Sequence, residues 1–158
     1  MSQKRRLVRE KVLQALYAYE YSKNAPDVVV DDVLQDLLAD KDQHEFAKKL
    51  FLKTIESVKE IDDLINKKVE HWEFSRLAVL DKLILRMAIA EILYFGDIPP
   101  KVSINEAIEI ARAYSTMKSD KFVNGVLDSV LDFLKKNGKL NKVGRGLLEH
   151  SIKPKKPA

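Results

Sequence analysis

The chain has 158 residues and no cysteine, which excludes disulfides, thiolate metal sites and thiol nucleophiles. Its net charge of +4 is unevenly spread, because five Lys and Arg face one Glu in residues 1–12 and six face one Glu in residues 138–158. Basic terminal segments on an otherwise acidic chain favour a polyanionic partner such as a nucleic acid. For the C-terminal segment, the alternative is that its charge only increases solubility.

Apolar residues recur at helical spacing in the first half of the chain, as in the stripe of Val8, Val12 and Leu16. This spacing predicts an antiparallel group of three helices, separated by breaks such as the proline-containing segment 24–27. The three predicted helices cover residues 4–22, 33–38 and 46–69.

The second half of the chain has the same spacing, with a serine near each predicted helix start. A serine oxygen at such a start accepts a hydrogen bond from a free amide of the first turn. Pro99 and Pro100 separate two of the helices, and Gly138 follows the end of the last one. The predicted starts are Ser75, a further cap at Asp81, the capping box of Ser103 with Glu106, and Ser119.

The fold class is therefore all-α, with about seven helices in two packed three-helix bundles. Residues 1–137 are predicted to form the folded domain. Residues 138–158 contain glycines, prolines and few large apolar side chains, so we expect a basic, flexible C-terminal tail there.

No pattern in the sequence indicates catalysis, a cofactor or a metal. The three histidines, His44, His71 and His150, lie in different regions without a second ligand at helical spacing. A glycine-rich phosphate loop and a nucleophile in a glycine elbow are also missing. The start of the chain has no apolar segment long enough for export, and charged residues interrupt the longest apolar stretch. A soluble, cytoplasmic protein is expected.

Two aromatic residues lie away from the apolar stripes and next to cations. On a helical wheel at about 100° per residue, Tyr17 and Arg6 fall roughly 140° and 120° from the centre of the first stripe. Phe122 lies at the edge of the last stripe, near Lys118 and Lys121. Rings beside cations suit single-stranded nucleic acid. The alternative for Tyr17 is packing on a neighbouring helix or a protein partner, and the alternative for Phe122 is a wedge in the seam between the two helix groups.

The start of the last predicted helix has two further features. Its free amides favour an anion such as a phosphate. Gly125 lies one turn inside, where glycine costs about 1 kcal/mol relative to alanine. Either close packing or the close approach of a ligand is therefore expected at Gly125.

Two stretches resemble the NusB family. Residues 83–125 read LILRMAIAEILYFGDIPPKVSINEAIEIARAYSTMKSDKFVNG, with the family's LR-x-A-x-x-E, IP-x-KV-x-INEAIE-x-A and KFVNG elements. The start, RRLVREKVLQALY, is similar to the arginine-rich first helix of that family. The resemblance spans residues 4–134 and is most specific in INEAIE followed by KFVNGVLD.

The resemblance implies a transcription antitermination factor of two packed helical bundles that catalyses nothing. The implied partners are single-stranded RNA of the boxA type from ribosomal RNA leaders, ribosomal protein NusE, and an antitermination complex with RNA polymerase. The implied RNA-binding residues are Lys4, Arg5, Arg6, Arg9, Tyr17, Lys118, Lys121, Phe122 and Asn124. The implied NusE-facing residues are Asp81, Arg86 and Glu91.

The chain departs from the family pattern at two places. Leu7 stands where many relatives have a third arginine, and Lys118 stands where relatives often have an acidic residue. A cation at position 118 should strengthen the attraction for RNA. We expect the basic first helix, Tyr17 and Phe122 to share one continuous positive surface.

Two other functions stay open at this point. One is a stand-alone relative of the helical domain of rRNA cytosine methyltransferases, although the chain ends about twenty residues after the last predicted helix, which leaves no room for a catalytic domain. The other is a scaffold that binds only proteins. A homodimer covering the arginine-rich face is also an open alternative.

Overall fold

The computed structural model describes residues 2–69, 74–116 and 118–148, and within these ranges it contains seven α-helices and no strand. The prediction of an all-α fold is confirmed. The helices are α1 (Ser2–Ser22), α2 (Pro26–Val33), α3 (Lys41–Glu56), α4 (Val58–Asn66), α6 (Val79–Tyr94), α7 (Pro100–Tyr114) and α8 (Ser119–Lys136). Two short 3-10 helices, η1 (Gln35–Leu37) and η2 (Gly144–Leu147), complete the described elements.

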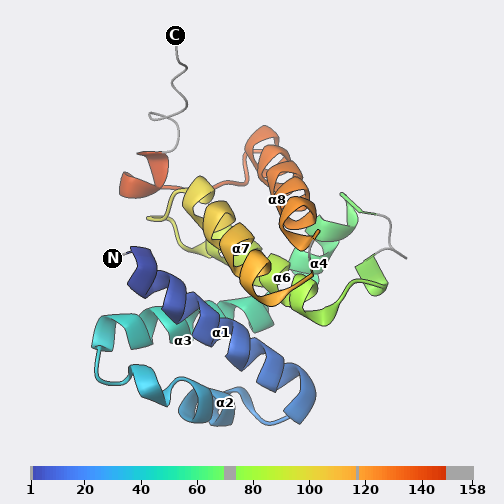
Figure 1. Ribbon diagram of the computed structural model, residues 1–158. Helices are drawn as coiled ribbons and strands as arrows, with labels where there is room; N and C mark the ends of the chain where they lie inside the picture. The colour runs from blue at the N-terminus through green and yellow to red at the C-terminus, as the bar shows by residue number, and fades with distance from the viewer. Residues whose placement is uncertain (1, 70–73, 117, 149–158) are drawn as a thin grey trace.

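Two groups of helices pack against each other, as predicted. Figure 1 shows α1, α2 and α3 in one group and α4, α6, α7 and α8 in the other. Helix α6 is the central element, because it contacts α1, α3, α4, α7 and α8. Ten of its sixteen residues are buried, which explains why its sequence is apolar on nearly every side. None of the helices described is long and apolar enough to cross a membrane.

The predicted long third helix is divided into α3 and α4 at Ser57. The backbone of Ser57, with φ −106° and ψ 17°, lies outside the α-helical region. Helix α3 packs on α1 and α6, whereas α4 packs on α6 and α8. The apolar spacing continues through this corner because both helices bury one side against α6. The predicted second helix, residues 33–38, is wrong: α2 lies before it and ends at Val33, and Gln35–Leu37 form the 3-10 helix η1. Helix α2 can begin at Pro26 because a proline needs no amide in the first turn.

The predicted serine caps are wrong. Helix α6 begins after Ala78, α7 begins after Pro99, and Lys118 occupies the N-cap position of α8. None of these three residues makes a side-chain capping hydrogen bond. Asp81 lies in the first turn of α6 and does not start a helix of its own.

Two of the serines predicted as caps, Ser103 and Ser119, instead donate hydrogen bonds to buried carboxylates. The hydroxyl group of Ser103 donates to Glu91, and that of Ser119 donates to Asp81 at 3.0 Å. A buried carboxylate without donors costs more free energy than an uncapped but solvated helix end. The hydroxyl groups are therefore used inside the protein, where the sequence pattern gives no sign of their partners.

Part of the predicted flexible tail lies against the end of α6. The ammonium group of Lys142 is buried and donates to the carbonyl oxygen of Phe95 at 2.8 Å, which satisfies a free acceptor at the helix C-terminus. Gly146 lies so close to Gly96 that a Cβ atom would collide with the carbonyl oxygen of Gly96. Residues 138–148 thus differ from the prediction, and the remainder of the tail lies outside the described residues.

Candidate nucleic-acid interface

Arg9 lies inside the protein rather than on its surface. Its guanidinium group donates two hydrogen bonds to the carboxylate of Glu91, at 2.9 and 3.0 Å. The side chains of Arg9 and Glu91 are only 6% and 2% exposed. The prediction that Arg9 contacts RNA does not fit this geometry, because a guanidinium closed off from solvent cannot reach a phosphate. The helical wheel already indicates the burial of Arg9, since this residue falls only about 60° from Val12, which lies in the apolar stripe.

Arg6 is half-buried and also has an internal partner. Its guanidinium group donates to both carboxylate oxygens of Glu106, at 2.7 and 3.0 Å. The hydrogen bond with Glu106 raises the pKa of Arg6, so the guanidinium group stays charged. About a third of the Arg6 side chain remains exposed, compared with 9% of Glu106. Arg6 can therefore face a ligand while it stays bound to α7.

Arg5 and Lys4, unlike Arg6 and Arg9, have no hydrogen bond to a buried carboxylate in the described ranges. The guanidinium carbon of Arg5 lies 3.9 Å from the centre of the Phe46 ring. Burial lowers the pKa of Arg5, and the neighbouring charge of Arg9 acts in the same direction. Lys4 forms an exposed ion pair with Asp40 at 2.8 Å. We call Lys4, Arg5 and Arg6 the α1 patch.

The three residues predicted to face NusE belong mostly to the interior. Asp81 is buried and accepts hydrogen bonds from Ser119 and, at 2.5 Å, from Ser115. Glu91 is buried with Arg9. Arg86 keeps 16% of its side chain exposed. The buried hydrogen bonds of Asp81 and Glu91 hold helices together. Of the three residues, Arg86 alone reaches the surface of the part of the chain that the structure describes.

Arg86 links three helices at that surface. Its guanidinium group donates to both carboxylate oxygens of Asp62 on α4, at 2.8 and 2.9 Å. A longer contact of 4.0 Å joins it to Glu20 on α1. A partner that used Arg86 would have to share it with these carboxylates.

The start of α8 carries exposed cations beside an aromatic ring. Lys118, Lys121 and Asn124 are exposed, and Phe122 is half-buried with part of its ring packed on the core. We call Lys118, Lys121, Phe122 and Asn124 the α8 patch. The first turn of α8 also contains Asp120, whose carboxylate accepts from the amide of Lys121 at 2.8 Å. A phosphate at this helix start would therefore have to displace a carboxylate.

Gly125 is exposed and directly follows Asn124 of the α8 patch. A Cβ atom built on Gly125 would have no described atom within 4 Å. Close packing between helices therefore does not explain this glycine. Of the two explanations that the sequence leaves open, the close approach of a ligand is the one consistent with the structure.

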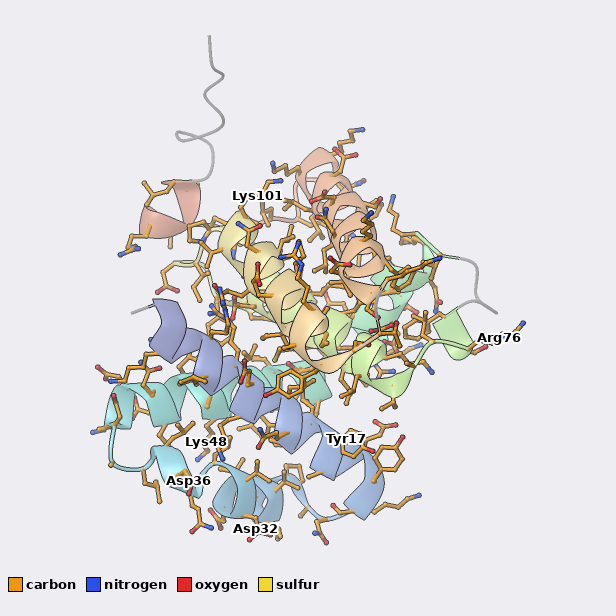
Figure 2. The ribbon with its side chains drawn as sticks, in the orientation of Figure 1. Tyr17, Asp32, Asp36, Lys48, Arg76 and Lys101 are labelled. Atoms are coloured by element: carbon orange, nitrogen blue, oxygen red, sulfur yellow. The ribbon has the colours of Figure 1, made fainter. Side chains whose placement is uncertain are left out.

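Tyr17 points away from the core, as predicted from the helical wheel. Figure 2 shows it projecting from the C-terminal half of α1, and 45% of its surface is exposed. Its ring lies 4.8 Å from the ring of Tyr21, centre to centre, at an angle of 44°. Packing on a neighbouring helix within this chain is therefore not its role.

The α1 patch and the α8 patch do not form one continuous positive surface. Figure 1 shows α7 between α1 and α8. On α7, Arg112 donates to Glu109 at 2.7 Å and to Asp120 of α8 at 3.0 Å. Paired charges thus separate the two patches, which corrects the expectation of a single cationic surface.

The described residues contain no group of three or more His, Asp or Glu side chains suited to hold a metal ion. His44 is half-buried, and His71 and His150 lie outside the described residues. The α1 patch and the α8 patch each place cations beside an aromatic ring, Phe46 and Phe122 respectively. These features define a class of small helical-bundle proteins that bind nucleic acid through side chains on helix surfaces.

The chain belongs to the NusB family, whose model matches residues 6–132. A relative from Chloroherpeton thalassium, a transcription antitermination protein NusB, is 46% identical over 155 residues, which are 98% of this chain and 74% of the relative. The structure of NusB from T. maritima is 40% identical, with a TM-score of 0.75 over 81% of this chain and 90% of that one.

A third similar protein was solved as a complex. One chain of a crystal structure of antitermination factors NusB and NusE with double-stranded RNA is 26% identical to this chain. The TM-score is 0.74, and the match covers 84% of this chain and 99% of the other. The likeness therefore extends over nearly the whole of a NusB chain.

Proposed function

We propose that this protein is a transcription antitermination factor that acts in the cytoplasm and catalyses no reaction. It binds boxA-like RNA together with ribosomal protein NusE, within an antitermination complex of RNA polymerase. The observation that carries the proposal is the likeness, over 84% of the chain, to a NusB solved with NusE and double-stranded RNA. Membership of the NusB family supports it.

The exposed side chains favour unpaired RNA. Phe122 and Tyr17 offer ring surfaces on which bases stack, and a base inside a duplex is not free to do so. Lys118 and Lys121 attract phosphates beside Phe122, and Asn124 offers an amide for hydrogen bonds. In this proposal Arg9 is a positioning residue, because it holds α1 on α6 through Glu91.

The separation of the two patches gives NusE a physical role. A strand that binds both patches must cross the paired charges of α7, where the protein offers little net attraction. A partner that covers this interval would add its own surface and join the two sites. We propose that this increase in local concentration makes the pair bind RNA more tightly than either protein alone.

An RNA titration at several salt concentrations tests the proposal. If about four phosphates are neutralised, the slope of log affinity against log salt should be roughly −3 for a single strand. Replacing Lys118 and Lys121 together by Gln should weaken binding and reduce the slope by about 1.4. Replacing Lys41 and Lys48 by Gln removes the same charge elsewhere and is the control.

The same titration separates the rival functions. Single-stranded boxA-like RNA, a scrambled strand and a duplex are compared with and without NusE. We expect the boxA-like strand to bind best, and more tightly with NusE. Negligible binding to all three RNAs, with and without NusE, would favour a scaffold that binds only proteins. An RNA affinity that does not change with salt concentration would contradict phosphate contacts.

Lys118 offers a test in which stability and binding move in opposite directions. It occupies the N-cap of α8 without a side-chain cap, and Asp is a preferred residue there. The backbone of Lys118, with φ −100° and ψ 3°, is not the extended one that a capping side chain needs, so the gain comes from the helix dipole alone. Lys118→Asp should therefore stabilise the fold by roughly 0.5 kcal/mol in urea denaturation while it weakens RNA binding. Unchanged RNA affinity at low salt would show that Lys118 is not part of the interface.

A further inference from the structure

A second group of cations surrounds an aromatic ring at the far end of α8. The ammonium groups of Lys68, Lys67 and Lys139 lie 5.4, 5.6 and 6.0 Å from the centre of the Phe133 ring. The three lysines are exposed, and Phe133 is half-buried. They come from the end of α4 and from the segment after α8, so the fold and not the local sequence brings them together.

These lysines have no carboxylate partner among the described residues. The ion pairs of the structure include Lys136 with Asp132 nearby, but none of the three lysines around Phe133. Three ammonium groups around one ring repel one another, and the ring itself offsets this only weakly. An anion that lies between them would remove the repulsion, so the cluster is suited to a phosphate.

The cluster borders an open cavity of about 670 Å³. Phe133, Lys67 and Lys139 form part of its wall, and Glu60 and Asp63 form another part. A nucleotide has groups for each of these: a phosphate for the lysines, a flat base for the ring, and amino groups for carboxylates. A purely acidic peptide would be repelled by Glu60 and Asp63.

Phe133 and Phe122 lie on the same side of α8. At about 100° per residue they differ by roughly 20° around the helix, and at about 1.5 Å per residue they are roughly 16 Å apart along it. Gly125 and Ser129 lie between them, and neither has a large side chain to obstruct a strand. At roughly 3.4 Å per nucleotide of stacked strand, about five nucleotides span this distance.

We propose that the α8 track, made of Phe122, Gly125, Ser129 and Phe133 with the lysines at both ends, continues the RNA site along α8. Phe122 and Phe133 stack two bases of one strand, and Lys67, Lys68 and Lys139 bind its phosphates beyond the α8 patch. This inference rests on the proposed function, because the strand that enters the track is the RNA bound at the α8 patch.

The test compares a short and a long boxA-like single strand on the full chain. The short strand is just long enough to cover the α8 patch, and the long one extends past it by about ten nucleotides, twice the length that the track requires. Lys67, Lys68 and Lys139 are replaced together by Gln, and the matched control replaces Lys23, Lys41 and Lys48 by Gln. Phe133→Leu is a second variant, which keeps apolar volume in the core while it removes the ring.

We expect the triple variant to bind the long strand about 10- to 100-fold more weakly near 0.1 M salt, with a salt slope reduced by roughly 2. Phe133→Leu should also weaken the long strand. Binding of the short strand by all variants, and of both strands by the control variant, should be unchanged. Circular dichroism at the temperature of the titration should show the same helix content for all variants.

Other results would overturn the α8 track in distinguishable ways. If the unmodified protein binds both strands but the triple variant binds the long one equally well, the track is wrong and the proposed function stands. If both strands weaken equally, the lysines act through overall charge only. If NusE binding is lost while RNA binding is kept, the surface belongs to a protein partner. If the unmodified protein binds neither strand, the proposed function fails with it.

Discussion

Replacing Arg9 by Met decides whether this arginine binds RNA or holds the fold together. The variant keeps most of the side-chain length but leaves the carboxylate of Glu91 without its cation in a site that is only 2% exposed. Breaking a buried ion pair from one side costs about 3–5 kcal/mol. A single domain is stable by roughly 5–15 kcal/mol, so this is a large share of the total.

Urea denaturation followed by circular dichroism measures the loss. With a slope of about 2 kcal/mol per molar urea, the midpoint should fall by roughly 2 M. The double variant Arg9→Met with Glu91→Leu removes both charges, and it should recover most of the stability because no buried charge is left unpaired. Ser103, which donates to Glu91, can turn to a carbonyl oxygen of its own helix.

RNA binding of the folded double variant then separates the two roles of Arg9. Because the guanidinium is buried, we expect the double variant to bind boxA-like RNA as the unmodified protein does. The reasoning would be refuted if Arg9→Met proved as stable as the unmodified protein and lost RNA affinity. In that case the Arg9–Glu91 pair would have to open to expose Arg9.

Three further predictions follow from single contacts. Gly125→Ala should stabilise the protein by about 1 kcal/mol, since the added Cβ atom meets open space, but it should weaken binding in the RNA titration. Equal RNA binding would show that the absence of a side chain at position 125 is not needed. Gly146→Ala should detach η2 from Gly96 and speed amide exchange and trypsin cleavage at Arg145, whereas the exposed Leu147→Ala, its control, should not. The hydrogen bond from Arg112 lowers the pKa of Asp120 in the folded state, so its contribution is present above about pH 4 and lost as the pH falls further. The melting temperature of Asp120→Asn should therefore fall less on acidification than that of the unmodified protein, and parallel curves would contradict this.

The sequence predicted the helices that pack on α6 well, because burial on α6 imposes a period that their apolar residues must follow. Val12 in the first apolar stripe and Val123 in the last one are both fully buried. The corner at Ser57 was not predictable from this signal, because α3 and α4 both face α6 and the spacing runs through the corner without interruption.

Helix starts and charged side chains were harder to predict, since their partners are distant in the sequence. Ser103 and Ser119 look like caps locally, but they donate to Glu91 and Asp81, which lie 12 and 38 positions away. A charged residue is exposed by default, and nothing local to α1 shows that Glu91 lies opposite Arg9. The lysines around Phe133 could not be predicted as a cluster, because Lys67 and Lys68 are distant from Phe133 in the sequence.

The cations of the first helix have different roles according to how deeply they are buried, and Arg6 is the intermediate case. A guanidinium group has five N–H donors, and Glu106 uses one on Nε and one on Nη2, which leaves donors for a phosphate on the exposed side. The Arg6–Glu106 pair is nevertheless neutral as a unit, so a phosphate bound there gains hydrogen bonds but releases few counterions. Lys4 differs, because its pair with Asp40 is exposed and such pairs contribute little. The salt-dependent attraction of the α1 patch must therefore come mainly from Lys4 and Arg5, while Arg6 contributes direction.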